Sequence, residues 1–435
     1  MSQSITNSAA AVINERFPDK FCINLDRRPE RWQQMQRKFA QHGIHSVERF
    51  AAFDGNDMEL PPNWLHTPGA YGCLRSHVQV VREARRLGLS SVLIFEDDVV
   101  FDSQLESKFA ACIQQLPDDW DMLFFGALHK DEPIKVSENI TRITGANSTY
   151  ACALKSSVFD AFIELNSNTG EVLDNNSLVL QKQFNCYCFM PHLAWVETCH
   201  SDAQLRVVDH WYLRESLVLF SPEVDRLLTQ TTLIFAHGNR SGSEGMSENL
   251  RFLLNYYHKF FSPHIAMVVV EQGPSATVDS AALPANCEYI FLRDDSGFNK
   301  ERCFAAGFSQ ANSRRKFVIL SDDDIYLETL DFRANLRMCE RYDCVTGLSK
   351  IIDLTNESSL RLRDTKSTQG LDITNNSSTN NEHPGYFRFF NRPAIQILLD
   401  EGESSEGRTP LLSLQPRDHL RVFESPNYAL RLQQD

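Results

Sequence analysis

Two groups of adjacent acidic residues each follow a short apolar run. Glu96–Asp98 follows Ser91–Phe95, and Asp322–Asp324 follows Phe317–Leu320. Neighbouring carboxylates repel one another unless a cation lies among them. Mg²⁺ or Mn²⁺ takes oxygen ligands and can also bind a diphosphate. The pattern therefore predicts a metal-assisted diphosphate site, with the candidate ligands Glu96, Asp97, Asp98, Asp322 and Asp324.

Other interpretations of the acids are structural or belong to a different chemistry. Aspartate is common in helix N-caps and in solvated turns after strands, so either group could serve the fold alone. A phosphatase with an aspartyl nucleophile would need Asp-x-Asp followed closely by Thr or Val. Asp324 is followed by Ile325 and Tyr326, which disfavours that chemistry.

The elements that must position the first group follow a β/α rhythm. Phe21–Leu25 predicts a strand, and Trp32, Met35 and Phe39 recur at the spacing of an amphipathic helix. Further strands and helices alternate up to Ser91–Phe95 and beyond it. We expect an α/β fold with a mostly parallel, Rossmann-like sheet and helices on both faces. Ligands of such sheets bind beyond the carboxyl ends of the strands, where the acids are expected.

The same rhythm begins again after about residue 225. Thr231–Ala236 predicts a strand, Asn299–Ala311 a helix, and Phe317–Leu320 the strand before the second acid group. The repetition favours two similar domains in tandem over one large sheet. The predicted domains are residues 15–222 and 226–435.

Composition restricts the class of protein. The 435 residues carry a net charge of −14, which argues against nucleic acid as a partner because phosphate backbones need a basic surface. The 11 cysteines lack metal-knuckle spacing, which favours reduced thiols and a cytoplasmic protein. No stretch of 18 apolar residues predicts a transmembrane helix, so membrane contact would be peripheral.

The N-terminal half resembles glycosyltransferase family 25, which includes bacterial lipooligosaccharide galactosyltransferases and collagen galactosyltransferases. The resemblance spans about residues 19–205 and keeps the order of the family's motifs. It implies a GT-A fold, a nucleotide-sugar donor, commonly UDP-galactose, and a divalent metal, Mn²⁺ or Mg²⁺. The matching stretches are Ile23–Trp32, Phe50–Gly55, Gly72–His77, Val92–Val99, Trp120–Gly126 and Ser201-Asp202.

This resemblance also assigns roles. Asp97 and Asp98 would hold the metal and the donor diphosphate, and a carboxylate such as Asp174 or Asp202 would be the general base. The residues expected to contact the donor are Arg27, Arg28, Ser76 and His77. For the two arginines a solvated basic face is an equal alternative, and His77 could equally be a hydrogen-bonded structural histidine.

The C-terminal half resembles the β-1,4-galactosyltransferase and chondroitin-polymerase types over about residues 230–400. Phe298–Phe308 matches their Asn-Lys/Arg helix, and Asp322 and Asp324 fall on their Asp-x-Asp positions. Ala305 stands where the family often has a second Asn, and the Gly-Trp-Gly-x-Glu-Asp segment that carries the base is absent. The further site candidates here are Arg240, Asn299 and Arg302 for the donor and Asp418 for the base.

Both resemblances imply inverting transfer of a hexose, with galactose expected, from a UDP-sugar to a hydroxyl of a glycan, lipooligosaccharide or protein. The second domain would be either a second transferase, which makes the chain bifunctional, or a degenerate domain that binds acceptor. The alternative from another class is a non-catalytic protein that binds nucleotide sugars or glycans on decayed transferase domains. A sugar-1-phosphate nucleotidyltransferase is disfavoured, because the first loop, Asp26–Pro29, is not the Gly-rich phosphate loop of those enzymes.

Overall fold

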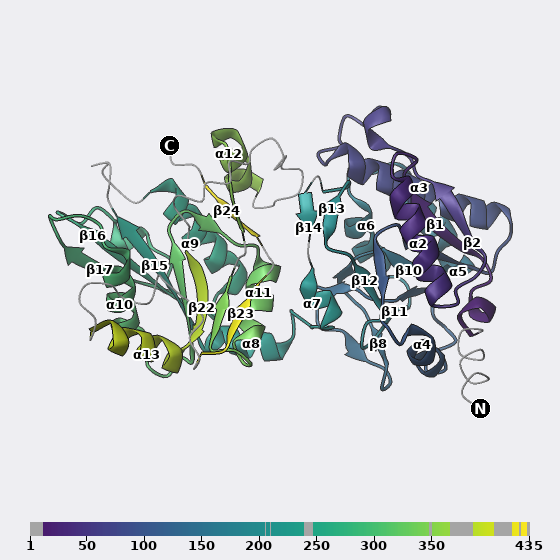
Figure 1. Ribbon diagram of the computed structural model, residues 1–435. Helices are drawn as coiled ribbons and strands as arrows, with labels where there is room; N and C mark the ends of the chain where they lie inside the picture. Colours follow the sequence, from purple (N-terminus) through teal and green to yellow (C-terminus); the bar gives the residue numbers. More distant parts are fainter. Residues whose placement is uncertain are drawn as a thin grey trace. The chain divides into compact units, whose positions relative to one another are not determined.

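The chain forms two compact units, residues 1–220 and residues 221–435, called unit 1 and unit 2 below. Figure 1 shows each as a twisted sheet with helices packed against it. The computed structural model describes residues 12–204, 206–208, 210–238, 247–347, 350–365, 386–403, 420–425 and 428–432.

The sheet of unit 1 has the strand order β2-β1-β3-β10-β5-β11-β8-β7. β10 and β8 run antiparallel to their neighbours, whereas the other strands share one direction. The strands are β1 (Lys20–Asn24), β2 (Val47–Ala51), β3 (Ser91–Glu96), β5 (Met122–Phe124), β7 (Ile134–Lys135), β8 (Ile140–Arg142), β10 (Ala151–Lys155) and β11 (Cys186–Phe189).

Helices cover both faces of this sheet. Val92 and Ile94 of β3 share a core with α3 (Pro68–Arg86) and α5 (Ser156–Ser167). Phe95 faces the opposite way, with its ring 5.3 Å from Phe39 of α2 (Pro29–Gln41). This alternation is what a strand buried on both faces requires. The other elements of unit 1 are η1 (Gly55–Asp57), β4 (Val99–Phe101), α4 (Leu105–Ile113), β6 (Leu128–His129), β9 (Ala146–Asn147), α6 (Leu173–Leu180), β12 (Ala194–Val196), β13 (Cys199–Ser201), β14 (Arg206–Val208) and α7 (Trp211–Arg214).

The sheet of unit 2 has the order β17-β16-β15-β18-β22-β20-β23. Only β22 among these described strands runs against the others. As with β10 in unit 1, it lies beside the strand that leads into the acids. The strands are β15 (Thr231–Gly238), β16 (Ala266–Gly273), β17 (Cys287–Arg293), β18 (Phe317–Asp322), β20 (Cys344–Thr346), β22 (Phe387–Asn391) and β23 (Val422–Glu424).

Helices also cover both faces in unit 2. Ile234 of β15 shares a core with α10 (Lys300–Gln310) and α13 (Arg392–Glu403). The ring of Phe235 lies 6.3 Å from Tyr257 of α9 (Glu248–Phe261) on the other face. The other elements are α8 (Pro222–Thr229), η2 (Ser280–Ala282), β19 (Ile325–Tyr326), α11 (Thr329–Met338), β21 (Lys350–Asp353), α12 (Asn356–Thr365) and β24 (Tyr428–Arg431).

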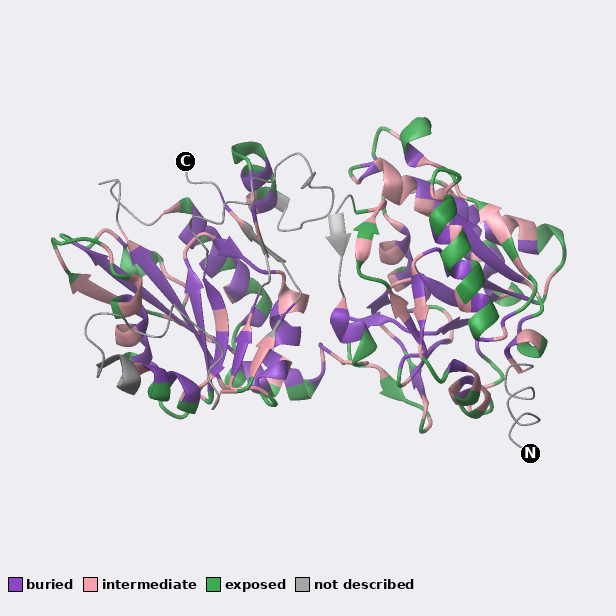
Figure 2. Cartoon of the chain, in the orientation of Figure 1, coloured by how far each residue is buried: buried purple, intermediate pink, exposed green. Residues whose placement is uncertain are grey.

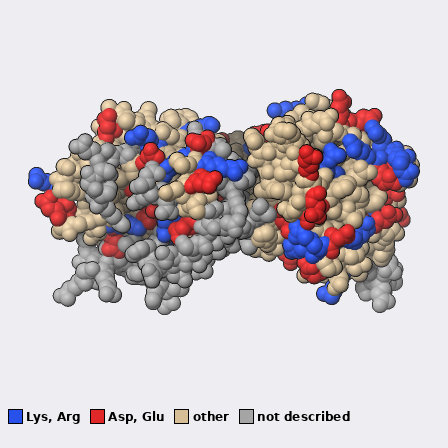
Figure 3. Space-filling view, turned by 90° about the horizontal axis from the view of Figure 1, so that it is seen from above, with Lys and Arg blue, Asp and Glu red and all other residues tan. Residues whose placement is uncertain are grey.

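The predicted fold class, α/β with mostly parallel sheets between helices, is confirmed. Figure 2 shows the buried strands inside each unit and the exposed outer faces of the helices. On the face drawn in Figure 3, described acidic and basic side chains are interspersed. All 11 cysteines are free thiols. None of the helices in the described part of the chain has the length and apolar character needed to cross a bilayer.

Candidate functional site

Asp97 follows β3 and is held on both sides. Its Oδ1 accepts a hydrogen bond from Arg31 Nη1 at 2.9 Å, and its Oδ2 accepts one from Asn24 Nδ2 at 2.7 Å. Asn24 ends β1, which lies beside β3, so the parallel pairing brings the two strand ends together. Arg31 and Asp97 are both largely buried, so this is an ion pair shielded from solvent.

Asp98 is the less satisfied acid of the pair. Its Oδ2 lies 3.9 Å from Arg31 Nη1, beyond hydrogen-bond distance, and its buried Oδ1 has no hydrogen-bond partner among the described residues. Burial and the neighbouring charge of Asp97 raise the pKa of Asp98 to about 6. A buried carboxylate oxygen that accepts no hydrogen bond is suited to bind a cation.

The Glu96 side chain lies beside His77 of α3 and Thr149. Its Oε1 lies 3.8 Å from His77 Nε2 and 3.4 Å from Thr149 Oγ1. Burial, then the charges of Asp98 and Asp174, raise the pKa of Glu96 well above its ordinary value. Asp174, in α6, accepts a hydrogen bond from the Ser148 backbone N–H at 2.9 Å. The structure thus places Glu96 beside His77 and Thr149, where the charges of Asp98 and Asp174 both act on its carboxyl.

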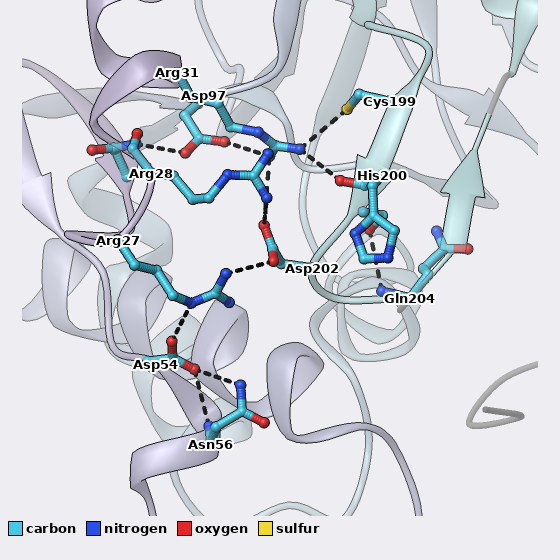
Figure 4. A network of polar contacts seen from close by, with 12 residues as sticks. Arg27, Arg28, Arg31, Asp54, Asn56, Asp97, Cys199, His200, Asp202 and Gln204 are labelled. Atoms are coloured by element: carbon cyan, nitrogen blue, oxygen red, sulfur yellow. Dashed lines mark hydrogen bonds and ion pairs between the residues drawn. The ribbon is translucent and has the colours of Figure 1, made fainter. Parts of the chain in front are cut away.

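Three arginines converge on Asp202, as Figure 4 shows. Arg27 Nη1 lies 2.9 Å from one Asp202 oxygen, and Arg28 Nη1 lies 2.8 Å from the other. Arg31 reaches the His200 carbonyl at 2.6 Å and lies 3.9 Å from Asp202. Arg27 also binds Asp54 at 2.6 Å. The two predicted donor arginines are therefore ion-paired, while 45% of the Arg27 side chain is exposed.

A pocket of about 220 Å³ opens beside these groups. It is smaller than a typical site for a whole ligand, so it suits the charged part of one. Cationic and anionic side chains line it together, which fits a diphosphate carried with a divalent ion. The lining residues are Arg28, Glu30, Arg31, Gln34, Asp97, Asp98, Glu197 and Cys199.

Ser76 and His77 have partners that serve the fold. Ser76 Oγ donates to the Gly72 carbonyl at 2.7 Å and accepts from the Phe53 N–H at 2.9 Å. His77 is buried, and its Nδ1 lies 3.0 Å from the Cys73 carbonyl. Burial lowers the pKa of His77 to about 4, which keeps the ring neutral. These contacts support the structural interpretation that the sequence left open for His77.

The segment that builds this site is similar to proteins of one family. Residues 17–148 match the model of glycosyltransferase family 25 (LPS biosynthesis protein). The match includes the three arginines, Asp97 and Asp98, and it ends before Asp174, Asp202 and the whole of unit 2.

Single relatives agree with the family match. The chain is 33% identical over 125 residues to "Glycosyltransferase 25 family member" of Drosophila pseudoobscura pseudoobscura, covering 24% of this chain and 20% of that protein. It is 26% identical over 156 residues to "Procollagen galactosyltransferase 1" of Danio rerio, covering 31% and 26%. It is 26% identical over 129 residues to "Inactive glycosyltransferase 25 family member 3" of Homo sapiens, covering 25% and 22%. The matched stretch thus spans about a quarter of these relatives.

Among solved structures, the chain is similar to 4-diphosphocytidyl-2C-methyl-D-erythritol synthase of Anaerococcus prevotii. The identity is 10%, the TM-score is 0.30, and the overlap covers 47% of this chain and 89% of that one.

The acids of unit 2, outside the family-25 match, have basic partners. Lys300 Nζ lies 2.6 and 2.7 Å from the two oxygens of Asp322, and the Tyr386 N–H donates to one of them at 2.9 Å. Asp323 pairs with His237 Nδ1 at 2.5 Å. Burial and the charges of its two neighbours raise the pKa of Asp324 to about 7. The positive charge of Lys300 thus offsets part of the negative charge of Asp322, Asp323 and Asp324.

The other candidates of unit 2 have structural contacts or lie outside the described residues. Asn299 is the N-cap of α10, where its Oδ1 accepts from the Arg302 N–H at 3.0 Å. Arg302 Nη1 pairs with Asp294 at 2.5 Å. Arg240 and Asp418 lie outside the part of the chain that the structure describes.

Sequence reasoning missed several members of the unit 1 pocket. Arg31 had a usable signal, because a helix beginning at Pro29 places it on the same side as Met35 and Phe39, which face the sheet. Asn24 ends β1, where polar side chains reach ligands in parallel sheets. Glu197 and Cys199 come from a segment about 100 residues away in sequence. The pairing of β12 with β4 and the bond from the Glu197 N–H to the Asp98 carbonyl bring this segment to the pocket.

Proposed function

We propose that the chain is a metal-dependent glycosyltransferase whose donor site is the unit 1 pocket at Asp97 and Asp98. The observation that carries this proposal is that those acids, Arg28 and Arg31 all line one opening. All four residues fall within the stretch that matches family 25.

In this proposal the donor diphosphate lies between Arg28, Arg31 and the two acids. Asp98 would supply the unpartnered oxygen to Mn²⁺ or Mg²⁺, and Asp97 would give a second ligand when Arg31 turns to the phosphate. The ion would supply charge stabilisation for the departing nucleoside diphosphate. Arg28 and Arg31 would stabilise the same charge from the protein side.

The general base is more readily assigned to Asp174 than to Asp202. Both oxygens of Asp202 are taken by arginines, so we assign it a role in holding Arg27 and Arg28 in place. Asp174 accepts a hydrogen bond from the Ser148 N–H, and burial raises its pKa, which moves a carboxylate toward the range useful for a base near neutral pH. Removal of the acceptor proton would allow inverting attack on the anomeric carbon.

We infer a hexose donor, with UDP-galactose as the first candidate, because one relative is named a procollagen galactosyltransferase. The acceptor would be a hydroxyl of a glycan, lipooligosaccharide or protein. We propose that the chain acts in the cytoplasm, with at most peripheral contact to a membrane. Lys300 forms an ion pair with Asp322 in unit 2. We therefore propose that unit 2 binds the acceptor and is not a second catalytic site.

Two observations favour the non-catalytic alternative. Asp97 is already held by both Arg31 and Asn24, and four relatives carry the name of an inactive or probable inactive family member. If the Arg31–Asp97 ion pair remains intact when the donor binds, the chain would bind nucleotide sugars without transferring the sugar.

Turnover of nucleotide sugars tests the proposal. A panel of UDP-sugars is incubated with Mn²⁺, and nucleotide release is followed for wild type, Asp98→Asn and the matched change Asp324→Asn in unit 2. We expect hydrolysis of at least one sugar nucleotide, a loss of about 100-fold in Asp98→Asn, and nearly full activity in Asp324→Asn. The reverse pattern would place the active site in unit 2. UDP binding without turnover of any sugar would support the non-catalytic alternative.

A further inference from the structure

Two histidines and a cysteine form a buried cluster apart from the acids of unit 1. His129 ends β6, Cys188 lies in β11, and His192 lies in the loop before β12. One ligand atom from each lies within 4.8 Å of the other two, and all three residues are buried. The two imidazole rings are 5.6 Å apart with 31° between their planes.

The ring nitrogens in this cluster lack the partners that buried polar atoms normally have. Neither Nδ1 nor Nε2 of His129 has a hydrogen-bond partner among the described residues, although its side chain is 1% exposed. His192 is 2% exposed, and its Nε2 also has no partner among them. Native proteins almost always satisfy such atoms with protein, water or an ion.

The orientation of His192 is fixed by its other nitrogen. His192 Nδ1 lies 3.0 Å from the Leu213 carbonyl, which can only accept, so Nδ1 must carry the proton. Nε2 is then left with a free lone pair. A backbone carbonyl holding one nitrogen while the other binds metal is the common arrangement of a zinc-ligating histidine.

We propose that His129, Cys188 and His192 of unit 1 bind a Zn²⁺ ion with three protein ligands. Two imidazoles and a thiolate are ligands that zinc prefers. Tetrahedral bonds of about 2.0–2.3 Å place ligand atoms about 3.3–3.6 Å apart, so the side chains need only small rotations to close around an ion. The Cys188 thiol would lose its proton to solvent as the Zn–S bond forms, and water would complete the coordination.

The position of this zinc site connects it to the pocket wall. Leu193, directly after His192, donates to the Phe125 carbonyl at 2.7 Å, and β12 then pairs with β4. The Glu197 N–H donates to the Asp98 carbonyl at 2.8 Å. An ion at His192 would therefore anchor the start of the segment that reaches Glu197 and Asp98. The zinc proposal does not depend on the proposed transferase activity.

Cobalt substitution of the full chain tests the site. The protein is stripped with chelator and titrated with Co²⁺, and the thiolate-to-cobalt absorption in the near ultraviolet is recorded together with zinc content by mass spectrometry. We expect a thiolate band and about one zinc per chain for wild type, falling below about 0.1 in Cys188→Ser and His129→Gln. Cys186→Ser, a buried thiol two residues away on the same strand, should keep both signals.

The variant Cys199→Ser separates this site from the acids near Asp98, because Cys199 is the thiol that lines their pocket and its loss should leave the band unchanged. A wild-type chain without the band, and with the zinc content of Cys188→Ser, would overturn the proposal. A band that persists in both Cys188→Ser and His129→Gln would overturn it as well. If a ligand variant fails to fold, a wild-type band that persists in both Cys73→Ser and Cys199→Ser supports the site, and a band lost in either of them overturns it.

Discussion

Asp98 carries its charge in surroundings that oppose it. Burial and Asp97 raise its pKa to about 6, above the ordinary value of 3.8. The folded protein thus holds this proton more tightly than the unfolded chain, so the carboxyl stabilises the fold at low pH. That stabilisation is lost as pH rises from 3.8 through 6, and above 6 the buried charge costs up to about 3 kcal/mol.

Replacing Asp98 with Asn should therefore stabilise the metal-free protein. We expect Asp98→Asn to raise the free energy of unfolding of unit 1 by about 1–3 kcal/mol at pH 7.5, and by less at pH 4.5. Mn²⁺ should stabilise wild type and leave the variant unchanged. Urea unfolding at the two pH values, with and without Mn²⁺, measures this. A variant less stable than wild type at pH 7.5 would show that Asp98 is satisfied in a way the structure does not reveal.

The sequence identified Asp97, Asp98, Arg27 and Arg28 through their place after strands and through the family motifs. It did not predict that Asp202 would pair with both arginines, because about 175 residues separate them. It also grouped Glu96 with its two neighbours. In the structure Glu96 ends β3 and lies 3.8 Å from His77, whereas Asp97 follows in the turn and lies 2.9 Å from Arg31.

At the scale of elements, the start of α3 is tied to the loop that carries Asp202. Thr67 caps the helix by accepting from the Ala70 N–H at 3.2 Å, and its hydroxyl donates to the Ala203 carbonyl. Gly69 lies so close to this loop that a Cβ there would be 2.0 Å from the Asp202 carbonyl oxygen. The helix start therefore positions Asp202, and through it Arg27 and Arg28.

Gly69→Ala should weaken nucleotide binding through this contact. Overpacking at backbone costs about 1–3 kcal/mol, and here it would displace Asp202, so we expect UDP affinity to fall about tenfold. Gly307→Ala is the matched control, because a Cβ there would meet Ile234 Cγ2 at 2.5 Å in unit 2. It should lower stability without changing UDP affinity. Equal UDP affinity for Gly69→Ala and wild type, measured calorimetrically, would argue against the arginines as donor contacts.

The elements themselves were predicted unevenly. Strand β3 and helix α2 follow local apolar patterns and match the expected positions closely. The expected β/α rhythm did not indicate β10, which inserts antiparallel between β3 and β5. Which strand pairs with which is decided by the whole sheet, so a five-residue strand such as Ala151–Lys155 gives no local sign of its partners.

At the scale of the whole molecule, each unit has its own hydrophobic core. The repeated acid-ended strand predicted two sheets, and both exist with an antiparallel strand beside the acids. The sequence could not rank the two sites. That ranking depends on Lys300 Nζ lying 2.6 Å from Asp322 Oδ1, whereas Arg31 Nη1 lies 3.9 Å from Asp98 Oδ2.

A marker for unit 2 is available in Asp343. It accepts from Asn391 Nδ2 at 2.9 Å and from the Arg421 backbone N–H at 2.9 Å, so it joins the ends of β20, β22 and β23. The Arg421 guanidinium lowers the pKa of Asp343 to about 2. Because Asp343 is partly exposed, Asp343→Asn should cost only about 1 kcal/mol, or a fall of about 2–4 °C in the Tm of unit 2.

Scanning calorimetry with UDP and Mn²⁺ tests most directly where the donor binds. We expect two unfolding transitions, of which Asp343→Asn lowers the one that belongs to unit 2. Saturating UDP and Mn²⁺ should raise the temperature of the unit 1 transition only. At ligand concentrations of 100 times the Kd, the free energy of unfolding of unit 1 should increase by about 2.7 kcal/mol. Asp98→Asn should abolish this increase. A ligand-induced rise confined to the transition that Asp343→Asn lowers would contradict a donor site in unit 1.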